Sequence, residues 1–234
     1  MNCGRGTSRR ALSMGAIYDG GAAPNSNKWI IKQPRGTPRR APTMNKLTLQ
    51  DIQNILDYER SRKPFRENII ALKKHRRVSI GDSITLVFEN RDTVQFQIQE
   101  MARVERLVED AQIQAELDVY NKLIPGENEL SATLMVDISD QSKIAATLDS
   151  LVGLHRMVFL EIGDERVAAH FDPSQFEEDR ISAVQYVTFP MTAAQREKFC
   201  DMSVKAGVVI GHPRYMQAVE FTPSIRSALI QDLL

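Results

Sequence analysis

The pattern that most constrains the fold is a nine-residue run in which apolar side chains occupy every second position. Its apolar residues are Leu130, Ala132, Leu134, Val136 and Ile138. Because successive side chains of a strand point to opposite faces, this period of two predicts a β-strand. The helical and strand patterns around it do not alternate strictly along the chain. An α+β fold, with mixed, mostly antiparallel sheets and helices packed on them, is therefore favoured over a doubly wound parallel sheet.

Helical patterns come before this strand. Thr48 and Asp51 form a variant capping box that predicts the start of a first helix. Pro64 predicts the start of a second helix, because its missing N–H costs nothing in a first helical turn. Apolar residues then recur at steps of three and four over 98–108 and again over 113–124, which predicts two further helices.

A strand region lies between these helices. Residues 78–88 alternate in polarity, with an interruption at Gly81-Asp82, and predict one bent strand or two short ones. The polar run 89–92 predicts a turn, and residues 93–96 predict a returning strand. We therefore expect a hairpin whose turn is built from Glu89, Asn90, Arg91 and Asp92.

After the central strand, the sequence predicts a mixture of hairpins and short helices. A hairpin around Gly163-Asp164 joins two strands, and Gly153 suits the left-handed end of a helix. The expected strands are 157–162, 166–171, 181–189, 208–210 and 216–221. The expected helices are one capped by Ser139-Asp140 and running to Leu151, one from Thr192 to about Ala206, and one that begins at Thr222-Pro223.

The charges divide the 234-residue chain into two unlike parts. Residues 1–43 hold eight basic groups and one acid, are rich in Gly, Ser, Pro and Asn, and show no apolar period. We expect this segment to be a disordered basic extension or a non-native start, with a nucleic-acid-binding arm as the alternative. Residues 44–234 carry a net charge of −7. A break near 125–129 would divide them into two lobes, and a single α+β domain fits their length equally well.

Several classes of protein are disfavoured. No run of 18 apolar residues exists, and two cysteines cannot form a disulfide framework or an iron–sulfur site. The common nucleotide-binding, hydrolase, kinase and zinc-protease motifs are absent, and the four histidines lack metal-ligand spacing. We therefore expect no metal and no cofactor. Cys200 fits a small buried thiol better than a nucleophile.

A basic cluster stands out where a predicted helix gives way to a strand. Residues 60–77 hold eight basic groups and one acid, a net charge of +7. The cluster ends in Lys73, Lys74, His75, Arg76 and Arg77. Such a cluster can bind phosphate, nucleic acid or an acidic partner. The alternative is a solvated positive face that pairs with acids of the same domain.

A second polar-dense segment follows directly. Its candidate binding residues are Glu89, Asn90, Arg91, Glu100, Arg103 and Glu105. At 100° per residue, Glu105 falls between Met101 and Val108 on the apolar side of the helix, where an acid must be paired or protonated. Its expected partners are Arg76, Arg77 or Arg91. Glu105 is either an acid–base or ligand-anchoring residue in a pocket, or one member of a structural ion pair. Glu59 is similarly placed on the first predicted helix.

The sequence resembles a bacterial family from about Leu47 to Leu234, in register. The similar segments are IIALKKHRRVSIGDSITLVFENRDTVQFQIQEMARVER, ELDVYNKLIPGENELSATLMV, SAVQYVTF and GHPRYMQAV. The family is domain-of-unknown-function family 3501, which has no established activity. Its genes often neighbour those for rubrerythrin-like di-iron proteins and iron–sulfur oxidoreductases. The resemblance therefore implies a cytoplasmic accessory protein of a redox or oxidative-stress system, with such an enzyme as its partner.

Three functions remain open at this level. The first is an interaction protein that docks on a redox enzyme through residues 73–77 and the adjacent 89–105 surface. The second is a small-anion-binding protein or enzyme, in which Arg76, Arg77 and Arg91 clamp the anion and Glu100 or Glu105 moves a proton. The third is nucleic-acid binding through the basic cluster, which is disfavoured because the rest of the domain would repel the phosphate backbone.

Overall fold

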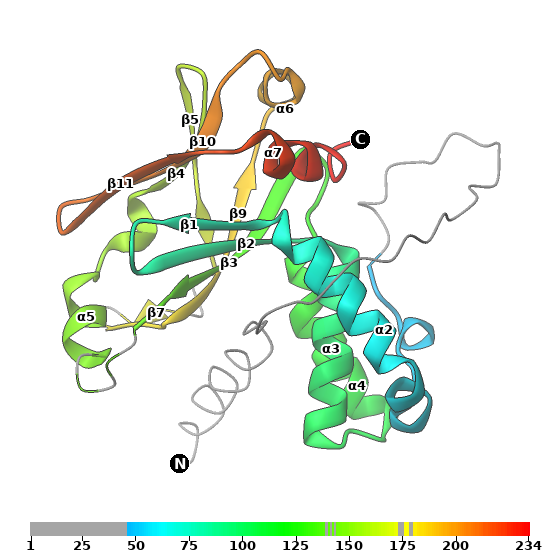
Figure 1. The fold of residues 1–234 in the computed structure, drawn as a ribbon. Coiled ribbons are helices and arrows are strands. Elements are labelled where there is room, and N and C mark those ends of the chain that lie inside the picture. The colour runs from blue at the N-terminus through cyan, green and yellow to red at the C-terminus, as the bar shows by residue number, and fades with distance from the viewer. Residues whose placement is uncertain (1–45, 139, 141, 143, 173–175, 178–179) are drawn as a thin grey trace.

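The computed structural model describes residues 46–138, 140, 142, 144–172, 176–177 and 180–234. The basic segment 1–43 and Ser139, a predicted helix cap, lie outside the described residues. Within them, two antiparallel β-sheets pack face to face, and a separate layer of helices extends from one end of the larger sheet (Figure 1). The fold is therefore α+β, as the order of sequence patterns predicted.

The larger sheet has five strands in the order β1-β2-β3-β9-β6. They are β1 (Arg77–Ile80), β2 (Ile84–Glu89), β3 (Glu129–Val136), β9 (Val184–Pro190) and β6 (His170–Phe171). The alternating run around Leu134 is strand β3, which pairs antiparallel with both β2 and β9. Gly81, at a φ of +62°, makes the tight turn between β1 and β2, so the interruption in the sequence separates two short strands.

The smaller sheet has four strands in the order β11-β10-β4-β5. They are β11 (Tyr215–Glu220), β10 (Ala206–His212), β4 (Val158–Ile162) and β5 (Glu165–Ala168). A two-stranded pair, β7 (Phe176–Glu177) with β8 (Arg180–Ile181), forms a small sheet of its own. The predicted hairpin around Gly163-Asp164 is confirmed as β4 and β5.

The main hydrophobic core lies between the two sheets. Leu86 and Phe88 of β2 join it with Leu160 of β4 and Val208 of β10. Phe221 packs edge-on against Phe88, with ring centroids 5.6 Å apart. Helices α6 (Ala193–Cys200) and α7 (Pro223–Ile230) close one end of this core, and α5 (Ile144–Ser150) with the short helix η5 (Leu154–Arg156) lies at the other end (Figure 1).

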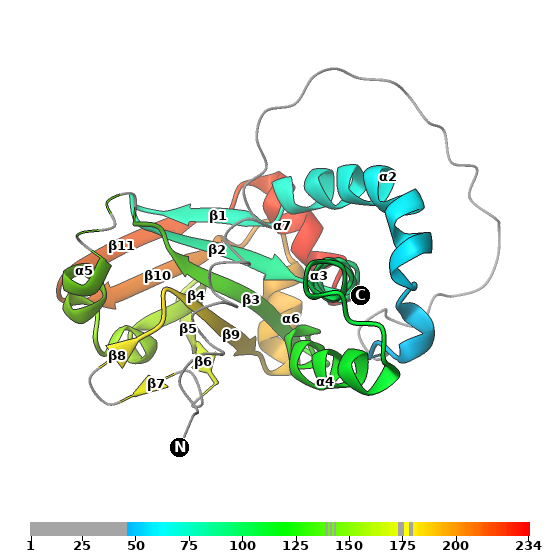
Figure 2. The ribbon, with the colours of Figure 1, turned by 90° about the horizontal axis from the view of Figure 1, so that it is seen from below.

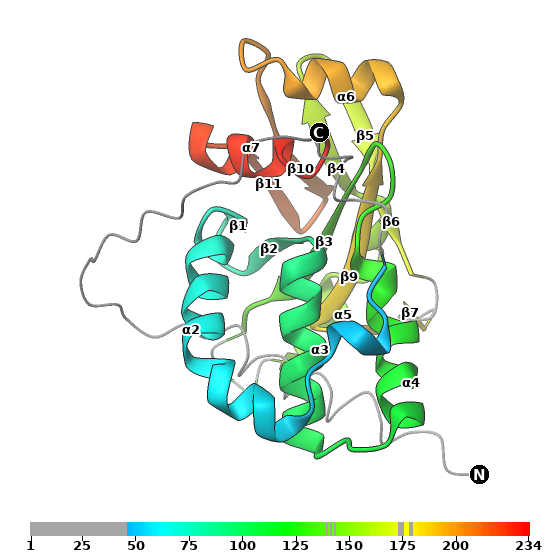
Figure 3. The ribbon, with the colours of Figure 1, turned by 90° about the vertical axis from the view of Figure 1, so that its right-hand side faces the viewer.

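The helical layer has a core of its own. It comprises η2 (Leu49–Asp51), α2 (Ile55–Lys74), α3 (Arg91–Glu105), α4 (Asp110–Tyr120) and η3 (Asn121–Leu123). Figure 3 shows α3 between α2 and α4, and α3 is buried along most of its length, from Thr93 to Ala102. Ile98 and Leu117 are central to its apolar contacts with α4. Tyr186 of β9 packs against both this helical core and the sheet.

The helix boundaries near the N-terminal end of the described chain differ from the prediction. The capping box of Thr48 and Asp51 forms, but it opens a single 3₁₀ turn. A single helix, α2, begins at the Asn54 cap and continues through Pro64. The predicted pair of helices is wrong because tertiary contacts to α3 keep both halves of α2 in one continuous helix despite the missing N–H of Pro64. Figure 2 shows that α2 curves along its length, as a helix that contains proline does.

The predicted returning strand over residues 93–96 is also wrong. These residues form the first turns of α3, because the Asn90 side chain accepts a hydrogen bond from the Thr93 amide at 3.0 Å and the Thr93 hydroxyl accepts one from the Asn90 amide at 2.9 Å. This reciprocal capping begins a helix where the polar run suggested a turn. The helix predicted to reach Ala206 ends at Cys200, since Ala206 is already part of strand β10.

Candidate functional site

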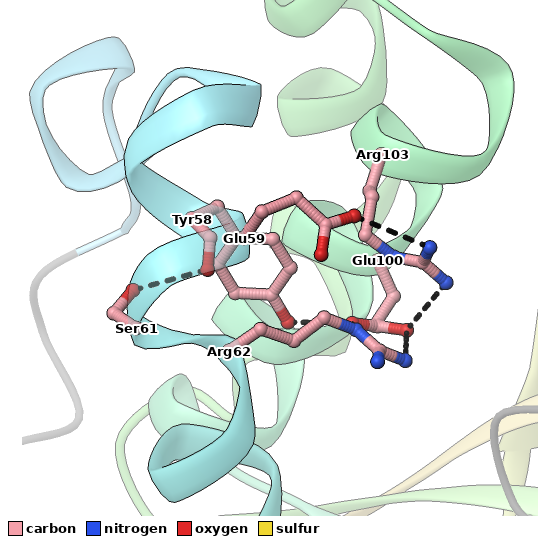
Figure 4. A network of polar contacts seen from close by, with 6 residues as sticks. All are labelled: Tyr58, Glu59, Ser61, Arg62, Glu100 and Arg103. Carbon is pink, nitrogen blue, oxygen red and sulfur yellow. Dashed lines mark hydrogen bonds and ion pairs between the residues drawn. The ribbon is translucent and has the colours of Figure 1, made fainter.

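An ionic network joins α2 to α3 (Figure 4). Glu100 of α3 is its centre, and its Oε1 accepts hydrogen bonds from the Tyr58 hydroxyl and from Nε of Arg62, both at 2.7 Å. Nη2 of Arg62 donates to the other oxygen at 2.9 Å, so this pair is bidentate. Arg103 lies 3.4 Å from Glu100 and 3.5 Å from Glu59, which extends the network back to α2.

The spacing of these residues on their helices explains the convergence. Tyr58 and Arg62 lie four residues apart, so they point from the same side of α2 toward α3. Glu100 and Arg103 lie three residues apart and face α2 from the other side. Because α2 and α3 pack antiparallel, Tyr58 and Arg62 of one helix meet Glu100 and Arg103 of the other in a single contact.

Burial and charge oppose each other at Glu100. Burial alone would raise the pKa of the Glu100 carboxyl, but hydrogen bonds from Arg62 and Tyr58 and the nearby positive charges outweigh it and lower that pKa. Burial and the bond to this carboxylate raise the pKa of the Tyr58 hydroxyl. Glu100 is therefore an ionised, fully used acceptor whose geometry suits a structural role better than proton transfer.

Arg76 forms a second, separate ion pair. Its guanidinium is buried and donates to both carboxylate oxygens of Asp232, at 2.6 and 2.7 Å. This contact fixes the C-terminal residues to the junction of α2 and β1. Burial raises the pKa of Asp232, while hydrogen bonds from Arg76 and Asn90 oppose that change. Arg76 is thus held by the protein itself and does not point outward.

The predicted anion clamp does not form. Arg76 is buried against Asp232, and Arg91 donates to Asp51 of η2 at 2.6 Å, while Arg77 lies exposed on β1. Most of the 89–105 segment is also buried, so within it only Asp92, Val104 and Glu105 are exposed to a docking partner. Lys74, the last residue of α2, is exposed.

The prediction that Glu105 is a buried acid is wrong. Glu105 is exposed, at the last position of α3, and the apolar residues beside it are exposed too, with Val104 at 52% and Val108 at 71%. The helical angle was correct, but the last turn of α3 extends beyond the part that neighbouring elements cover. Glu100, a little more than one turn earlier, is the acid that the helix buries.

A third group of polar side chains lies on the strand side of the helical layer. Glu89 and Thr133 are buried, and Oγ1 of Thr133 donates to Oε1 of Glu89 at 2.7 Å. Ser131 lies directly opposite Glu89 in the strand register. The charge of Glu89 acts on Lys73, whose Nζ lies 5.9 Å from the centre of the Phe96 ring. This group therefore combines a buried amine, a buried carboxylate and two hydroxyls.

Several of these residues carry no recognisable sequence signal. Arg62 belonged to the basic run, but nothing distinguished it from its neighbours. Tyr58, Thr133 and Asp232 lie 42, 44 and 156 residues from their partners. Their roles follow only from tertiary packing. In the part of the chain that the structure describes, no group of three or more His, Cys, Asp or Glu residues could hold a metal ion.

These features define a class of protein: two packed antiparallel sheets with a helical layer that buried ionic contacts tie together. The chain belongs to the family described as protein of unknown function (DUF3501), which matches residues 46–233. It is similar to a structure described as a novel protein of unknown function from Burkholderia pseudomallei K96243, with 32% identity and a TM-score of 0.76. That likeness covers 81% of this chain and 100% of the other. No curated protein matches the chain. Among the described helices, none is long and apolar enough to cross a membrane.

Proposed function

We propose that this protein is an accessory protein that binds an acidic surface of a partner through the outer side of α2. The observation that carries the proposal is the poor coverage of this helix. Of its 20 residues, only Tyr58 and Ile69 are buried. A helix of this length normally buries a broad apolar stripe, so one long side of α2 remains available to a partner.

The outward side of α2 has a definite composition. Residues that recur at steps of three and four along it, and are all exposed, are Leu56, Arg60, Lys63, Glu67, Ile70 and Lys74. We call this row the α2 ridge. Three of its members are basic and one is acidic, although Arg60 also contacts Asp57 of its own helix at 3.1 Å. Leu56 and Ile70, at 74% and 40% exposure, add apolar contacts between the charges.

The charge of the rest of the domain orients an acidic partner toward the α2 ridge. Residues 60–77 carry +7, whereas residues 78–234 carry −12. An acidic partner is therefore attracted to α2 and repelled by the rest of the described surface, which orients the encounter. The same asymmetry opposes nucleic acid, because a phosphate backbone would meet the negative surface beside the ridge.

The proposed partner class comes from the family resemblance. A rubrerythrin-like protein or an iron–sulfur oxidoreductase from the same genome is the natural candidate, and the encounter is proposed to take place in the cytoplasm. The protein would then position or stabilise a redox enzyme, while the redox chemistry stays with the partner.

The test measures binding of the purified chain to each purified candidate over a range of salt concentrations. The ridge variant Arg60→Glu, Lys63→Glu and Lys74→Glu is compared with a matched control, Lys122→Glu, Lys205→Glu and Arg214→Glu, whose three residues are exposed elsewhere.

We expect the ridge variant to raise the dissociation constant at least tenfold, roughly 1.4 kcal/mol, and the control to change it little. Wild-type binding should also weaken as salt rises. Equal effects of the two variants, or no binding to either candidate, would refute the proposal. Salt-dependent binding to nucleic acid alone would favour that function instead.

A further inference from the structure

The smaller sheet turns one side to the hydrophobic core and the other side to solvent. Val158 and Leu160 of β4 and Val208 and Ile210 of β10 belong to the core. Because successive side chains of a strand point to opposite sides, the residues between them form an outer face. The members of this outer face across the four strands are Phe159, Glu161, Arg166, Ala168, Gly207, Val209, Gly211, Met216, Ala218 and Glu220.

The outer face is more apolar than a solvent-facing sheet normally is. The strand register places four apolar residues in one row across the sheet, in the order Ala218, Val209, Phe159 and Ala168. Ala168 and Ala218 are exposed, and Met216, at 73% exposure, lies beside this row. A sheet with one face in water usually carries polar residues on that face, so the apolar row indicates a surface that binds a partner.

The neighbouring row carries charges around a hollow. In the same strand order, it consists of Glu220, Gly207, Glu161 and Arg166. Gly207 has no side chain, and a hollow of about 340 Å³ lies there, with Lys205 at its border. Lys205 pairs with Glu220 at 3.2 Å, and Arg166 pairs with Glu161 at 3.6 Å. Such exposed pairs contribute little to stability, so they can exchange partners when the face is covered.

We propose that the outer face binds the outer face of a second copy of this chain, about a two-fold axis that runs along the strands between β10 and β4. A two-fold interface uses the same patch on both copies, so the patch must be complementary to itself. The proposed axis lies at the middle of the strand order β11-β10-β4-β5. It therefore places β10 of one copy over β4 of the other, and β11 over β5.

The apolar row is complementary to itself about this axis. Val209 of one copy meets Phe159 of the other, and Ala218 meets Ala168. The larger side chains therefore pair at the centre of the contact and the smaller ones at its sides. Packed sheets lie about 10 Å apart and within about 30° of each other, so this correspondence is closest near the axis.

The charged row is complementary to itself as well. Glu220 at one edge of a copy meets Arg166 at the opposite edge of the other copy. Glu161 meets Gly207, whose hollow receives the Glu161 carboxylate beside Lys205. A purely acidic or purely basic partner would be repelled by half of this row, so charge complementarity favours a second copy as the occupant.

The outer face is separate from the α2 ridge. Figure 1 shows the smaller sheet at the top of the molecule and α2 at the lower right, and the two sets of residues do not overlap. The inference therefore goes beyond the proposed docking function, and the dimer carries two ridges.

The size of the outer face determines how tightly the dimer forms. With strands about 4.8 Å apart and about 3.4 Å per residue, the face measures roughly 20 Å by 20 Å. That is about half of the roughly 800 Å² per partner in a standard interface. We therefore expect a reversible dimer with a dissociation constant in the micromolar range, and its population should rise with protein concentration.

The first test measures the oligomeric state of the purified chain by sedimentation equilibrium, from micromolar to millimolar concentration. Val209→Glu places a carboxylate opposite Phe159 of the second copy and should raise the dissociation constant of the dimer at least tenfold. The matched control is Val108→Glu, at an exposed valine of the helical layer. This control and the α2 ridge variant should leave the dissociation constant unchanged.

A charge exchange tests the two-fold symmetry. Arg166→Glu and Glu220→Arg each place like charges opposite each other, so each should raise the dissociation constant at least tenfold. The double variant should restore the dimer, and an equimolar mixture of the two single variants should form a mixed dimer. Within one chain these two positions are three strand spacings apart, roughly 14 Å, so this rescue reports a contact between copies.

Four results would overturn the proposal. They are a chain that stays monomeric at millimolar concentration, a dimer that Val209→Glu leaves intact, a dimer that the α2 ridge variant weakens instead, and a charge exchange that fails to rescue the dimer. A monomeric chain that binds phosphatidylcholine vesicles, and loses this binding in Val209→Glu, would assign the outer face to a lipid surface instead of a second copy.

Discussion

Replacing Glu100 by glutamine tests how the helical layer is held to itself. The change keeps the size of the side chain but turns one acceptor oxygen into a donor NH₂ group, which then faces the N–H groups of Arg62 or Arg103. The wild-type carboxylate accepts four hydrogen bonds, from Tyr58, twice from Arg62, and from Arg103. Its side chain is only 5% exposed, whereas those of the two arginines are 30% and 27% exposed.

The exposure of Arg62 and Arg103 determines how much the free energy of unfolding should fall in Glu100→Gln. Breaking a fully buried ion pair costs about 3–5 kcal/mol because a charge is left without a partner. Here both guanidinium groups can turn partly to water, so we expect Glu100→Gln to lower the free energy of unfolding by about 2–3 kcal/mol. For a folded part of this size, that corresponds to a decrease in the melting temperature of roughly 4–12 °C.

The assay is urea unfolding followed by circular dichroism at several pH values. Because the pKa of Glu100 is lowered in the folded protein, its contribution is fully present above the ordinary glutamate value of 4.5 and is lost as the pH falls through the folded value. The difference between wild type and Glu100→Gln should therefore shrink below pH 4.5. A change under about 0.5 kcal/mol at pH 7, within the range of ordinary surface substitutions, or a difference that does not depend on pH, would refute this reasoning.

Three other substitutions give distinct expectations. Asp232→Asn removes the carboxylate that pairs with the buried guanidinium of Arg76, and urea unfolding should show a loss of about 3–5 kcal/mol; a neutral effect would show that this pair adds no stability. Gly207→Ala would place a Cβ 2.1 Å from the backbone oxygen of Val219, so we expect β10 and β11 to be forced apart, with a large fall in melting temperature and weaker amide protection there; unchanged protection would contradict this. Asn90→Ala removes the cap of α3 and should cost about 1 kcal/mol by the same unfolding assay, so an effect below a few tenths would indicate that the cap is redundant.

The strand pattern of the chain was predictable because a period of two survives wherever one face is buried. The Leu130 run, the 78–88 strands and the Gly163 hairpin were all found from alternation and turn residues. The reciprocal caps at Thr192 and at Thr48 were recognisable too, since a cap depends on residues only three positions apart. At Thr48 the cap was correct, but the length of the helix behind it was not.

The candidate site was only partly predictable. The sequence indicated a cluster of charged residues near 60–105 and a buried acid on the helix predicted over 98–108. It selected Glu105 where packing buries Glu100, because helical spacing gives an angle around the axis but not how far along the helix its neighbours extend. The sequence also did not identify the partners of Glu100. Arg62 and the exposed Lys63 next to it belong to the same basic run, and no sequence signal distinguishes them.

The amino-acid sequence by itself thus determined the α+β class, the family, and the concentration of positive charge on one segment of the chain. These are properties of local spacing and composition, and they hold whatever the long-range contacts are. The tertiary structure alone decided that Arg76 turns inward to Asp232 and that the buried Glu89 carboxylate acts electrostatically on Lys73. Ion pairs and hydrogen bonds form across space between residues that the sequence keeps far apart, so only the packed chain shows which charges are used internally and which remain available for function.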